Sequence, residues 1–530
     1  MSEAIIYLLK KYGQKVKNRE DLESAKRLVC KQFKIGTILN ADILKEYREL
    51  INKGKIINNE SLSSLLRKRG IRTLSGIAPV AVLTKSYPCP GECAYCPHEK
   101  DVPVSYLSNE PAVMRAIRCD YDPYIQVVHR LKALVNNGHE PTKIELIVIG
   151  GTWSYLPIRY RYWYVLNCFR AANDFKKYEK KEKLIGIKSY YPKNLSLEKL
   201  RKLLQSEQKK NETTKYQIIG LTLETRPDYI SQAELLEMRE LGCTRVEIGV
   251  QAIDDNILKL NKRGHGVSEI AAATKALKQF GFKVTYHLMP ALPGATPKRD
   301  LEMFKQLFSD ERFQPDQIKF YPTVVTKGSL LYQWYKQGEY KPYSDKVLQK
   351  LIVDCKTVVP TYVRIIRLIR DIPSESIIAG NKITNLRQVM QQRGVKCNCI
   401  RCRESKEKTV KKYKINVLEY ASSGGQEYFI SVDSLDKKTL FGFCRLRLDF
   451  NSSISPALIR ELHIYGELVS VGGKEKTQHR GIGSELIKVA EKISKENGAK
   501  KISVISGVGV RGYYKKRGYK LKNTYLEKSL

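Results

Sequence analysis

Three cysteines in one short segment carry the most specific chemistry in this sequence. Cys89, Cys93 and Cys96 form a CxxxCxxC pattern directly after the apolar run Val80–Thr84. A [4Fe–4S] cluster takes four ligands, so three thiolates leave one iron open to a substrate. One alternative is structural zinc, which takes four donors, with His98 the one further donor close by. The other is three unrelated thiols. The spacing favours a reactive [4Fe–4S] cluster.

Glycine and amide residues end two further predicted strands. Gly150 and Gly151 follow the apolar segment Lys143–Ile149, and the missing side chains let the backbone approach a ligand closely. Gln251 ends another apolar segment with a polar side chain. Any tight turn can also use glycine. The ligand-binding interpretation is favoured because the pair lies one strand–helix unit after the cysteines. We interpret all three residues as cofactor contacts.

Charged residues occupy other strand ends of the same region. Glu224 and Arg226 follow a predicted strand, where a carboxylate can accept bonds from ribose hydroxyls and a guanidinium can pair with a carboxylate. A structural ion pair is the alternative. Lys143 and Lys319 lie at ends of apolar strands. Each lysine can place a cation beside a phosphate or a thioester carbonyl. For Lys319 we expect a catalytic role. A lysine that extends its charge to solvent is the alternative.

A second group of cysteines lies farther along the chain. Cys397, Cys399 and Cys402 stand close together after Arg393-Gly394. Thiolates at this spacing are typical of a structural zinc site, which needs one more ligand. The sequence therefore predicts a zinc-type cluster in a linker between two domains.

A glycine-rich segment near the C-terminus can bind a pyrophosphate. Gln478, Gly481 and Gly483 form a QxxGxG pattern that opens a predicted helix. Backbone N–H groups at such a helix start cradle phosphates, and the pattern resembles the coenzyme A loop of GNAT acetyltransferases. Downstream, Tyr513 and Tyr514 offer hydroxyl groups that can reach a thioester or the departing sulfur. Aromatic packing is the alternative, and we expect one tyrosine in each role.

The elements that must position these residues are of two kinds. From Val80 to about Ile372, apolar strands alternate with amphipathic helices, which predicts a parallel sheet in a full or partial (β/α) barrel with active residues at the C-terminal strand ends. After residue 410, longer antiparallel-looking strands predict a separate α+β domain. The expected strands are Lys143–Ile149, Ile218–Glu224, Arg245–Val250, Lys283–Leu288, Gln317–Tyr321, Val363–Ile366, Tyr428–Val432, Leu440–Leu448 and Lys501–Ser506.

Charge and composition narrow the functional classes. The 530 residues include 94 Lys and Arg against 55 Asp and Glu, a formal charge of +39 that favours nucleic acid as a partner. Residues 1–75 have helical periodicity and basic faces, which predicts a basic helical segment suited to RNA; a solvated cap on the next domain is the alternative. We expect further domains at 76–372, 373–409 and 410–530.

Cysteine use and hydropathy predict where the protein works. The start Met1-Ser-Glu-Ala has no signal-peptide character, and twelve cysteines fit metal-bound thiols in a reducing cytoplasm better than a disulfide framework. No apolar run approaches the roughly 20 residues needed to span a bilayer. We therefore expect a cytoplasmic protein without a membrane segment.

Several motifs together resemble one known family. The cysteine loop resembles that of radical S-adenosylmethionine (SAM) enzymes, whose open iron chelates SAM. The whole chain from about residue 75 resembles the catalytic subunit of Elongator, the tRNA uridine(34) acetyltransferase family, and the compact cysteine spacing resembles its archaeal or bacterial type. The motifs that carry this resemblance are Met114–Arg118, Tyr121–Tyr124, Glu224–Asp228, Arg460–Gly466 and Ile502–Gly509.

This resemblance implies a fold, a reaction and a set of contacts. It implies a radical SAM partial barrel followed by a GNAT domain, and the formation of a carboxymethyl group at carbon 5 of the wobble uridine of tRNA. A SAM-derived radical would take hydrogen from the methyl group of acetyl-CoA, and the carbon radical would add to a uracil unstacked from the anticodon loop. By the same resemblance, the residues that hold acetyl-CoA are Lys143, Glu461, Leu462, His463, Ile464, Ile482, Gly483, Ser484 and Tyr514.

Two other functional classes remain open on the sequence. The protein could acetylate protein lysines around a structural cluster, which requires a base near the thioester; Glu461, His463 and the tyrosines are the candidates. It could also be a nonenzymatic tRNA-binding scaffold, although the intact CxxxCxxC and QxxGxG motifs argue against decayed sites. Cleavage of SAM in the presence of tRNA and acetyl-CoA distinguishes the three classes.

Overall fold

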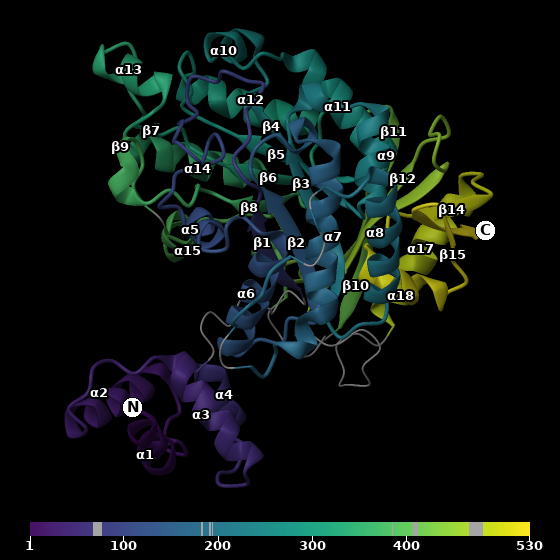
Figure 1. Cartoon of the computed structure of the whole chain (residues 1–530). Coiled ribbons are helices and arrows are strands. Elements are labelled where there is room, and N and C mark those ends of the chain that lie inside the picture. The colour runs from purple at the N-terminus through teal and green to yellow at the C-terminus, as the bar shows by residue number, and fades with distance from the viewer. Residues whose placement is uncertain are drawn as a thin grey trace.

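The chain has three structural parts, arranged as a small helical body, a central α/β unit and a C-terminal α/β unit (Figure 1). The computed structural model describes residues 1–66, 77–181, 184–189, 192, 194–383, 385–405, 412–465 and 481–530. Within these ranges, no helix combines the length and the apolar character that a membrane crossing requires.

The N-terminal part is a bundle of short helices with a core of its own. Its helices are α1 (Ser2–Tyr12), α2 (Arg19–Gln32), α3 (Asn40–Asn52) and α4 (Glu60–Leu66). The side chain of Asn18 accepts a hydrogen bond from Asp21 N–H and starts α2 with a capping box. Leu8, Val29 and Ile43 are fully buried at the centre of the bundle. Arg48 Nη1 ties the bundle to the central part by donating to Val135 O at 3.0 Å.

The central part is a seven-stranded parallel sheet in the order β1-β2-β3-β4-β5-β6-β8. β1 and β8 form its two edges, so the sheet is a partial barrel. The predicted strands are confirmed with shifts of at most a residue or two at their ends, since apolar strands buried on both faces are easily recognised in a sequence. The bounds are β1 (Ala78–Leu83), β2 (Lys143–Ile149), β3 (Gln217–Thr225), β4 (Arg245–Gln251), β5 (Lys283–Leu288), β6 (Gln317–Phe320) and β8 (Arg364–Arg367).

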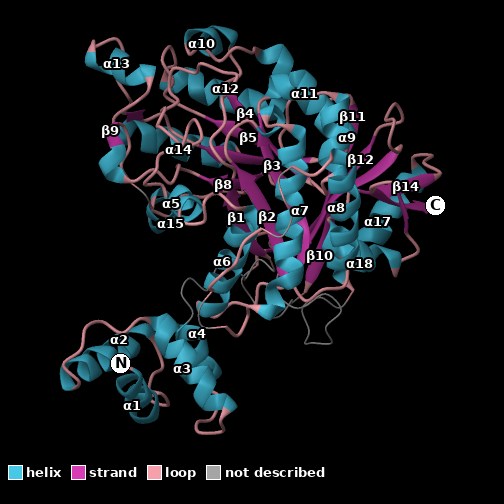
Figure 2. Cartoon of the chain, viewed as in Figure 1, coloured by secondary structure: helices cyan, strands magenta, loops and turns pink. Residues whose placement is uncertain are grey.

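Helices flank this sheet and leave the C-terminal strand ends to loops (Figure 2). The short strands β7 (Val325–Thr326) and β9 (Ile377–Ala379) form a separate pair. The helices are α5 (Pro111–Ile117), α6 (Pro123–Asn136), α7 (Ile158–Asp174), α8 (Leu197–Asn211), α9 (Gln232–Glu240), α10 (Asp255–Leu260), α11 (Val267–Gln279), α12 (Pro297–Ser309), α13 (Leu330–Lys336), α14 (Asp345–Val358), α15 (Leu386–Gln392) and α16 (Ile400–Arg403), with the 3-10 turns η2 (Trp153–Tyr155), η3 (Phe175–Lys177), η4 (Pro227–Tyr229) and η5 (Ser374–Ser376).

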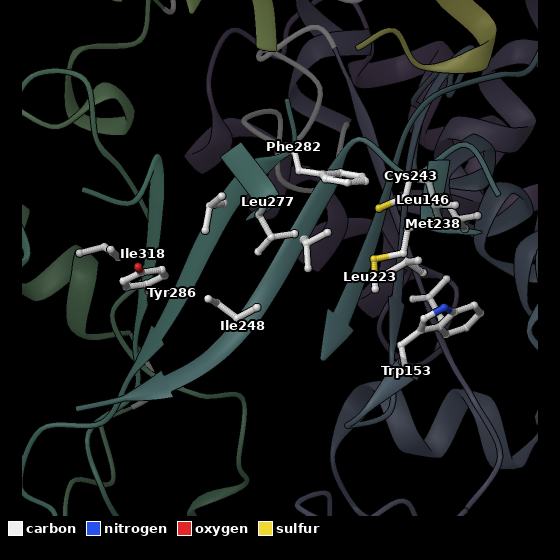
Figure 3. Packing of buried hydrophobic residues seen from close by; sticks show 14 of the residues in the cluster. Leu146, Trp153, Leu223, Met238, Cys243, Ile248, Leu277, Phe282, Tyr286 and Ile318 are labelled. Carbon is white, nitrogen blue, oxygen red and sulfur yellow. The ribbon is translucent and has the colours of Figure 1, made fainter. Parts of the chain in front are cut away.

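A continuous apolar core lies between the sheet and its helices. Leu223, Ile248 and Tyr286 come from neighbouring strands and pack with Leu277 of α11 (Figure 3). Each of these four side chains is fully buried. Burial of a large apolar side chain stabilises a fold by roughly 1.5–3 kcal/mol, so the core fixes the strands whose ends carry the polar residues.

The C-terminal part is a second seven-stranded sheet in the order β10-β11-β12-β13-β14-β16-β15. Its strands are antiparallel neighbours except for β13 and β14, which run parallel and pair over only two positions, Leu458–Ser503 and Ile459–Val504. Beyond these two positions, β13 continues to Ile464 paired with β12. The elements are β10 (Tyr413–Ser422), β11 (Gly425–Ser434), β12 (Leu440–Leu448), β13 (Ala457–Ile464), α17 (Ile482–Glu496), β14 (Lys501–Val504), η6 (Val508–Val510), α18 (Arg511–Lys515), β15 (Lys520–Lys522) and β16 (Tyr525–Ser529).

Glycines and buried ion pairs join the two sheets. A Cβ atom at Gly507 would lie 1.9 Å from Ile219 O on β3, so only glycine permits this close approach. Arg460 of β13 is fully buried, and its Nη2 lies 2.6 Å from Asp316 Oδ1 of the central part and 2.9 Å from Glu427 Oε2 of β11. The two units therefore share a charged as well as an apolar interface.

Candidate active site

One cavity of about 1150 Å³ extends from the cysteine loop to the C-terminal unit. Both predicted cofactor regions contribute to its wall, although they are hundreds of residues apart in the sequence. Among the residues predicted from the sequence, those that line it are Cys89, Cys93, Cys96, Gly151, Glu224, Arg226, Gln251, Lys319, Glu461, Leu462, His463 and Tyr514.

The cysteine loop is surrounded by positive charge. Arg263 Nη1 donates to Cys93 Sγ at 3.1 Å, and Arg226 Nη1 lies 4.0 Å from the same sulfur. The pKa of the Cys93 thiol is lowered to about 4, first by the hydrogen bond with Cys96 and then, against the effect of burial, by the Arg263 guanidinium. Arg226 also forms an ion pair with Asp228 at 2.8 Å. Thiolate donors stabilised by guanidinium groups fit the donor set of an iron–sulfur cluster.

The glycine pair after β2 closes around the loop that follows β1. Gly150 has φ +139°, and a Cβ atom there would lie 2.1 Å from Thr84 Oγ1. Gly151 has φ +99° and lines the cavity. Cys89 Sγ lies 4.0 Å from Thr152 Oγ1 of the same turn. The first glycine thus serves close packing between strand ends, whereas the second exposes backbone to the cavity.

A chain of polar side chains crosses the floor of the cavity. Tyr106 donates to Glu224 Oε2 at 3.1 Å, and His287 lies between Glu224 (Nδ1 to Oε1, 3.5 Å) and Glu247 (Nε2 to Oε2, 2.8 Å). Lys319 forms an ion pair with Glu247. Burial raises the pKa of Glu247, but Lys319 and His287 outweigh burial and hold that pKa well below its usual range. Burial likewise lowers the pKa of Lys319, and Glu247 more than compensates. Lys319 therefore acts as a cation and not as a base.

The opposite wall belongs to β13. Glu461 accepts a hydrogen bond from Arg445 Nε at 3.0 Å, and its other oxygen lies 3.5 Å from Lys283 Nζ. Burial raises the pKa of Glu461, but Lys283 and Arg445 outweigh it and lower the value to about 2. The ring of His463 packs on that of Tyr465, with centroids 4.4 Å apart. Glu461 is consequently a weak proton acceptor.

The start of α17 forms a second polar group behind this wall. Gly481 has φ +100°, and a Cβ atom at Gly483 would lie 2.5 Å from the Tyr513 hydroxyl. Arg517 Nη2 donates to Ser484 Oγ at 2.9 Å, and its guanidinium lies 3.6 Å from the centre of the Tyr513 ring. A helix start, a hydroxyl and a guanidinium together make a site for phosphate groups.

Several predicted residues lie away from the cavity wall. Lys143 begins β2, and burial lowers the pKa of its ammonium group. Tyr514 lines the cavity and is buried, whereas Tyr513 covers the start of α17. Gln478 falls outside the residues that the structure describes. The predicted residues outside the wall are Lys143, Gly150, Ile464, Gly481, Ile482, Gly483, Ser484 and Tyr513.

The second cysteine group is compact. The sulfur atoms of Cys397, Cys399 and Cys402 all lie within 4.8 Å of one another, as metal ligands do. Lys356 Nζ lies 3.8 Å from Cys402 Sγ. Among the described residues, the donor set therefore suits a cation bound by thiolates.

Sequence reasoning missed the arginines that complete these groups. Arg263 contacts the cysteine loop from 170 residues away in the chain, and Arg517 contacts Ser484 from 33 residues away. Arg370 donates to Ser105 Oγ at 3.0 Å and lies 3.1 Å from Glu110 Oε1, so it holds the segment after the cysteine loop. No spacing in the sequence indicated these arginines, because pairing across the fold leaves no local pattern.

Comparisons with known proteins match this arrangement. Residues 84–307 match the radical SAM superfamily, residues 315–394 match the radical SAM C-terminal domain and residues 399–519 match the GNAT acetyltransferase family. These matches confirm the predicted partial barrel followed by a GNAT domain. They imply a [4Fe–4S] cluster and SAM for the first domain and acetyl-CoA for the second.

Relatives resemble the chain over most of its length. The tRNA uridine(34) acetyltransferase of Dehalococcoides mccartyi is 42% identical over 482 residues, covering 87% of this chain and 100% of the relative. Human Elongator complex protein 3 is 37% identical, covering 88% of this chain and 86% of the relative. The structure of Methanocaldococcus infernus Elp3 lacking residues 1–46 superposes with a TM-score of 0.71 at 37% identity, covering 86% of this chain and 100% of that one. The chain therefore belongs to the family of tRNA uridine(34) acetyltransferases and Elongator complex protein 3.

Proposed function

We propose that this protein modifies the wobble uridine of tRNA, forming a carboxymethyl group at carbon 5 from acetyl-CoA. The observation that carries the proposal is the single cavity lined by both the cysteine loop and β13. A site that activates SAM and a site that holds a thioester then open into one space. Hydrogen can be taken from the acetyl methyl group there, and the activated carbon can join carbon 5 of the uracil. The adduct then loses the proton of carbon 5 to water and one electron, which balances the electron that splits SAM, and hydrolysis of the thioester leaves a carboxylate.

The residues of the cavity have separate tasks in this proposal. Cys89, Cys93 and Cys96 would hold the [4Fe–4S] cluster, which when bound supplies the electron that splits SAM into methionine and a 5′-deoxyadenosyl radical. Gly151 offers backbone groups to the methionine part of SAM, and Glu224 accepts bonds from its ribose hydroxyls. The buried groups behind them hold these contacts in place and exclude water.

The C-terminal unit would hold acetyl-CoA. The end of β13 can pair with the amide groups of pantetheine, because among the described strands its last residues pair with β12 and not with β14. The start of α17, with Ser484 and Arg517, is suited to the pyrophosphate. Tyr514 lines the cavity and is the candidate for contact with the thioester.

We further propose the domain limits 1–75, 76–372, 373–409 and 410–530, with tRNA bound across the first two. The compact thiols of Cys397, Cys399 and Cys402 support a structural zinc ion in the third. Zinc held by thiolates stabilises short segments that have little core of their own, as this linker has. Measurement of zinc content in the wild type and in Cys399→Ser tests this site.

The contacts of Glu461 argue against this residue as the base for acetylation of protein lysines. That reaction requires a base beside the thioester, and the carboxylate of Glu461 is held ionised by Arg445 and Lys283, with its pKa lowered to about 2. A carboxylate with so low a pKa accepts a proton poorly at neutral pH. The amine of a lysine substrate would have no effective base from this residue.

Labelled acetyl-CoA tests the proposed reaction. Acetyl-CoA with a deuterated methyl group should pass deuterium into 5′-deoxyadenosine in the presence of tRNA, and the modified uridine should keep the remaining label. Cys93→Ala should lose both products, because it removes a cluster ligand. Acetylated protein lysine with no label in deoxyadenosine would contradict the proposal, as would unchanged SAM cleavage by Cys93→Ala.

A further inference from the structure

Three tyrosines meet at the C-terminal ends of the first three strands. Tyr87 follows β1, Tyr155 ends η2 after β2, and Tyr229 ends η4 after β3. The ring centres of Tyr87 and Tyr155 are 6.2 Å apart, and those of Tyr155 and Tyr229 are 5.7 Å apart, both with edge-to-face geometry. We call these three residues the tyrosine cluster.

The tyrosine cluster adjoins the wall of the cavity. Tyr87 lies two residues before Cys89, Tyr155 three residues after Thr152, and Tyr229 three residues after Arg226. Cys89, Thr152 and Arg226 all line the cavity. The turns that carry the second and third tyrosines are joined by a hydrogen bond from Thr225 Oγ1 to Ser154 Oγ at 3.0 Å. The cluster is thus a fixed part of the rim on the side of the cysteine loop.

Core packing does not explain the exposure of Tyr155. Its side chain is 41% exposed, whereas Trp153 in the same turn is 3% exposed. Ile158, at the start of the following helix α7, is 38% exposed. Tyr155 and Ile158 are three residues apart and both open to solvent, so they offer an apolar face beside the mouth of the cavity.

Positive charge accompanies this apolar face. Arg159 of α7 is exposed, and so is Lys85, whose Nζ lies 5.1 Å from the centre of the Tyr160 ring in the same helix turn. Aromatic rings with lysine and arginine nearby are the combination by which proteins hold single-stranded nucleic acid, through stacking and phosphate contacts. The formal charge of +39 on the whole chain agrees with a polyanionic partner.

We propose that the tyrosine cluster, with Tyr155 at its exposed end, is a stacking platform for an unpaired nucleobase of the anticodon loop. This inference rests on the proposed function. A uridine that leaves its stack to enter the cavity deprives the adjacent base of a stacking partner. The exposed ring of Tyr155 replaces that partner beside the cavity and thereby holds the loop open around the reacting base.

Fluorescence of a labelled anticodon stem-loop tests the platform. A stem-loop with 2-aminopurine next to the wobble uridine should be quenched on binding to the full-length protein, because stacking quenches this base. Tyr155→Ala should weaken binding about tenfold and lose most of the bound-state quenching. Tyr155→Phe should retain both, since stacking needs the ring and not the hydroxyl. Phe450→Ala is the matched control, because Phe450 is also aromatic and 60% exposed but lies in the C-terminal unit.

Two results would overturn the inference. Tyr155→Ala could bind and quench the stem-loop like the wild type, which would leave the tyrosine cluster without a role in RNA binding. It could instead slow deoxyadenosine formation with flavodoxin as reductant but not with dithionite, which would assign the surface to an electron-donor protein. If the wild type itself fails to bind or modify the stem-loop, the proposed function is contradicted. This result differs from a loss that is seen only in Tyr155→Ala, which supports the stacking platform.

Discussion

Replacement of Arg460 by methionine should destabilise the protein strongly, because this arginine joins the two sheets through buried charges. Its guanidinium donates five hydrogen bonds, to Asp316, to Glu427 and to the carbonyl of Phe282, at 2.6–3.1 Å. Methionine retains an unbranched apolar stem but none of these bonds. Removal of one partner from a buried ion pair leaves an uncompensated charge and costs about 3–5 kcal/mol.

The remaining contacts of the two carboxylates place the expected loss near the lower limit. Asp316 keeps the hydrogen bond from Val284 N–H at 2.9 Å and the charge of Arg445 at 3.5 Å. Glu427 keeps Arg447 at 3.3 Å. We therefore expect Arg460→Met to lower the free energy of unfolding by about 3 kcal/mol.

Denaturant unfolding followed by fluorescence, with the first transition analysed, measures this loss. Lys202→Met is a matched control, because Lys202 Nζ also lies 2.6 Å from its carboxylate partner, Glu198, but both side chains are more than 70% exposed. An exposed pair of this spacing contributes only about 0.3–0.5 kcal/mol. Equal losses in the two variants would refute the reasoning that burial, and not distance, sets the value of the ion pair.

Three further outcomes are expected. Gly91→Ala should lower iron content and SAM cleavage, because the added Cβ atom would lie 2.0 Å from Arg226 Nη1. Gly36→Ala is the control and should change neither, because its Cβ atom would have no atom within 4 Å. Equal iron content in the two variants would contradict this prediction. The pKa of Glu461 is lowered to about 2 in the folded protein, against about 4.3 in the unfolded chain. Ionised Glu461 therefore stabilises the fold above about pH 4.3 by about 3 kcal/mol, and this stabilisation is lost as the pH falls toward 2. The unfolding free energy of Glu461→Gln should decline less steeply over this pH range. Deletion of residues 1–70 should weaken tRNA binding and flatten its dependence on salt, and an unchanged slope would make the segment a structural cap.

Much of the fold could be predicted because each element leaves a local pattern. The strand predicted at Lys283–Leu288 has those bounds in the structure, and the strand predicted at Gln317–Tyr321 ends one residue earlier. Apolar runs and helical periodicity reflect burial that each segment needs by itself. The QxxGxG motif likewise predicted the start of α17, which begins at Ile482.

The site was predicted less completely, because its residues act in pairs from distant segments. Glu224 and Lys319 were recognised as polar residues at strand ends, but their connection through His287 and Glu247 was not. Glu461 was a candidate base on the sequence, and its contacts with two cations made it a poor one. A pKa depends on the surroundings of the folded group, which sequence spacing does not describe.

Residue types and their spacing along the chain set the available ligands and the order of the domains. Cysteine spacing within one loop and glycine spacing at one helix start are set by the covalent chain, so CxxxCxxC and QxxGxG specify their chemistry before folding. Folding brings Arg263 to Cys93 and Arg460 to Asp316, and it lets the cysteine loop and β13 line one cavity. These contacts form because packing of apolar faces brings remote segments together and excludes water. The strength of each charge pair follows from that exclusion.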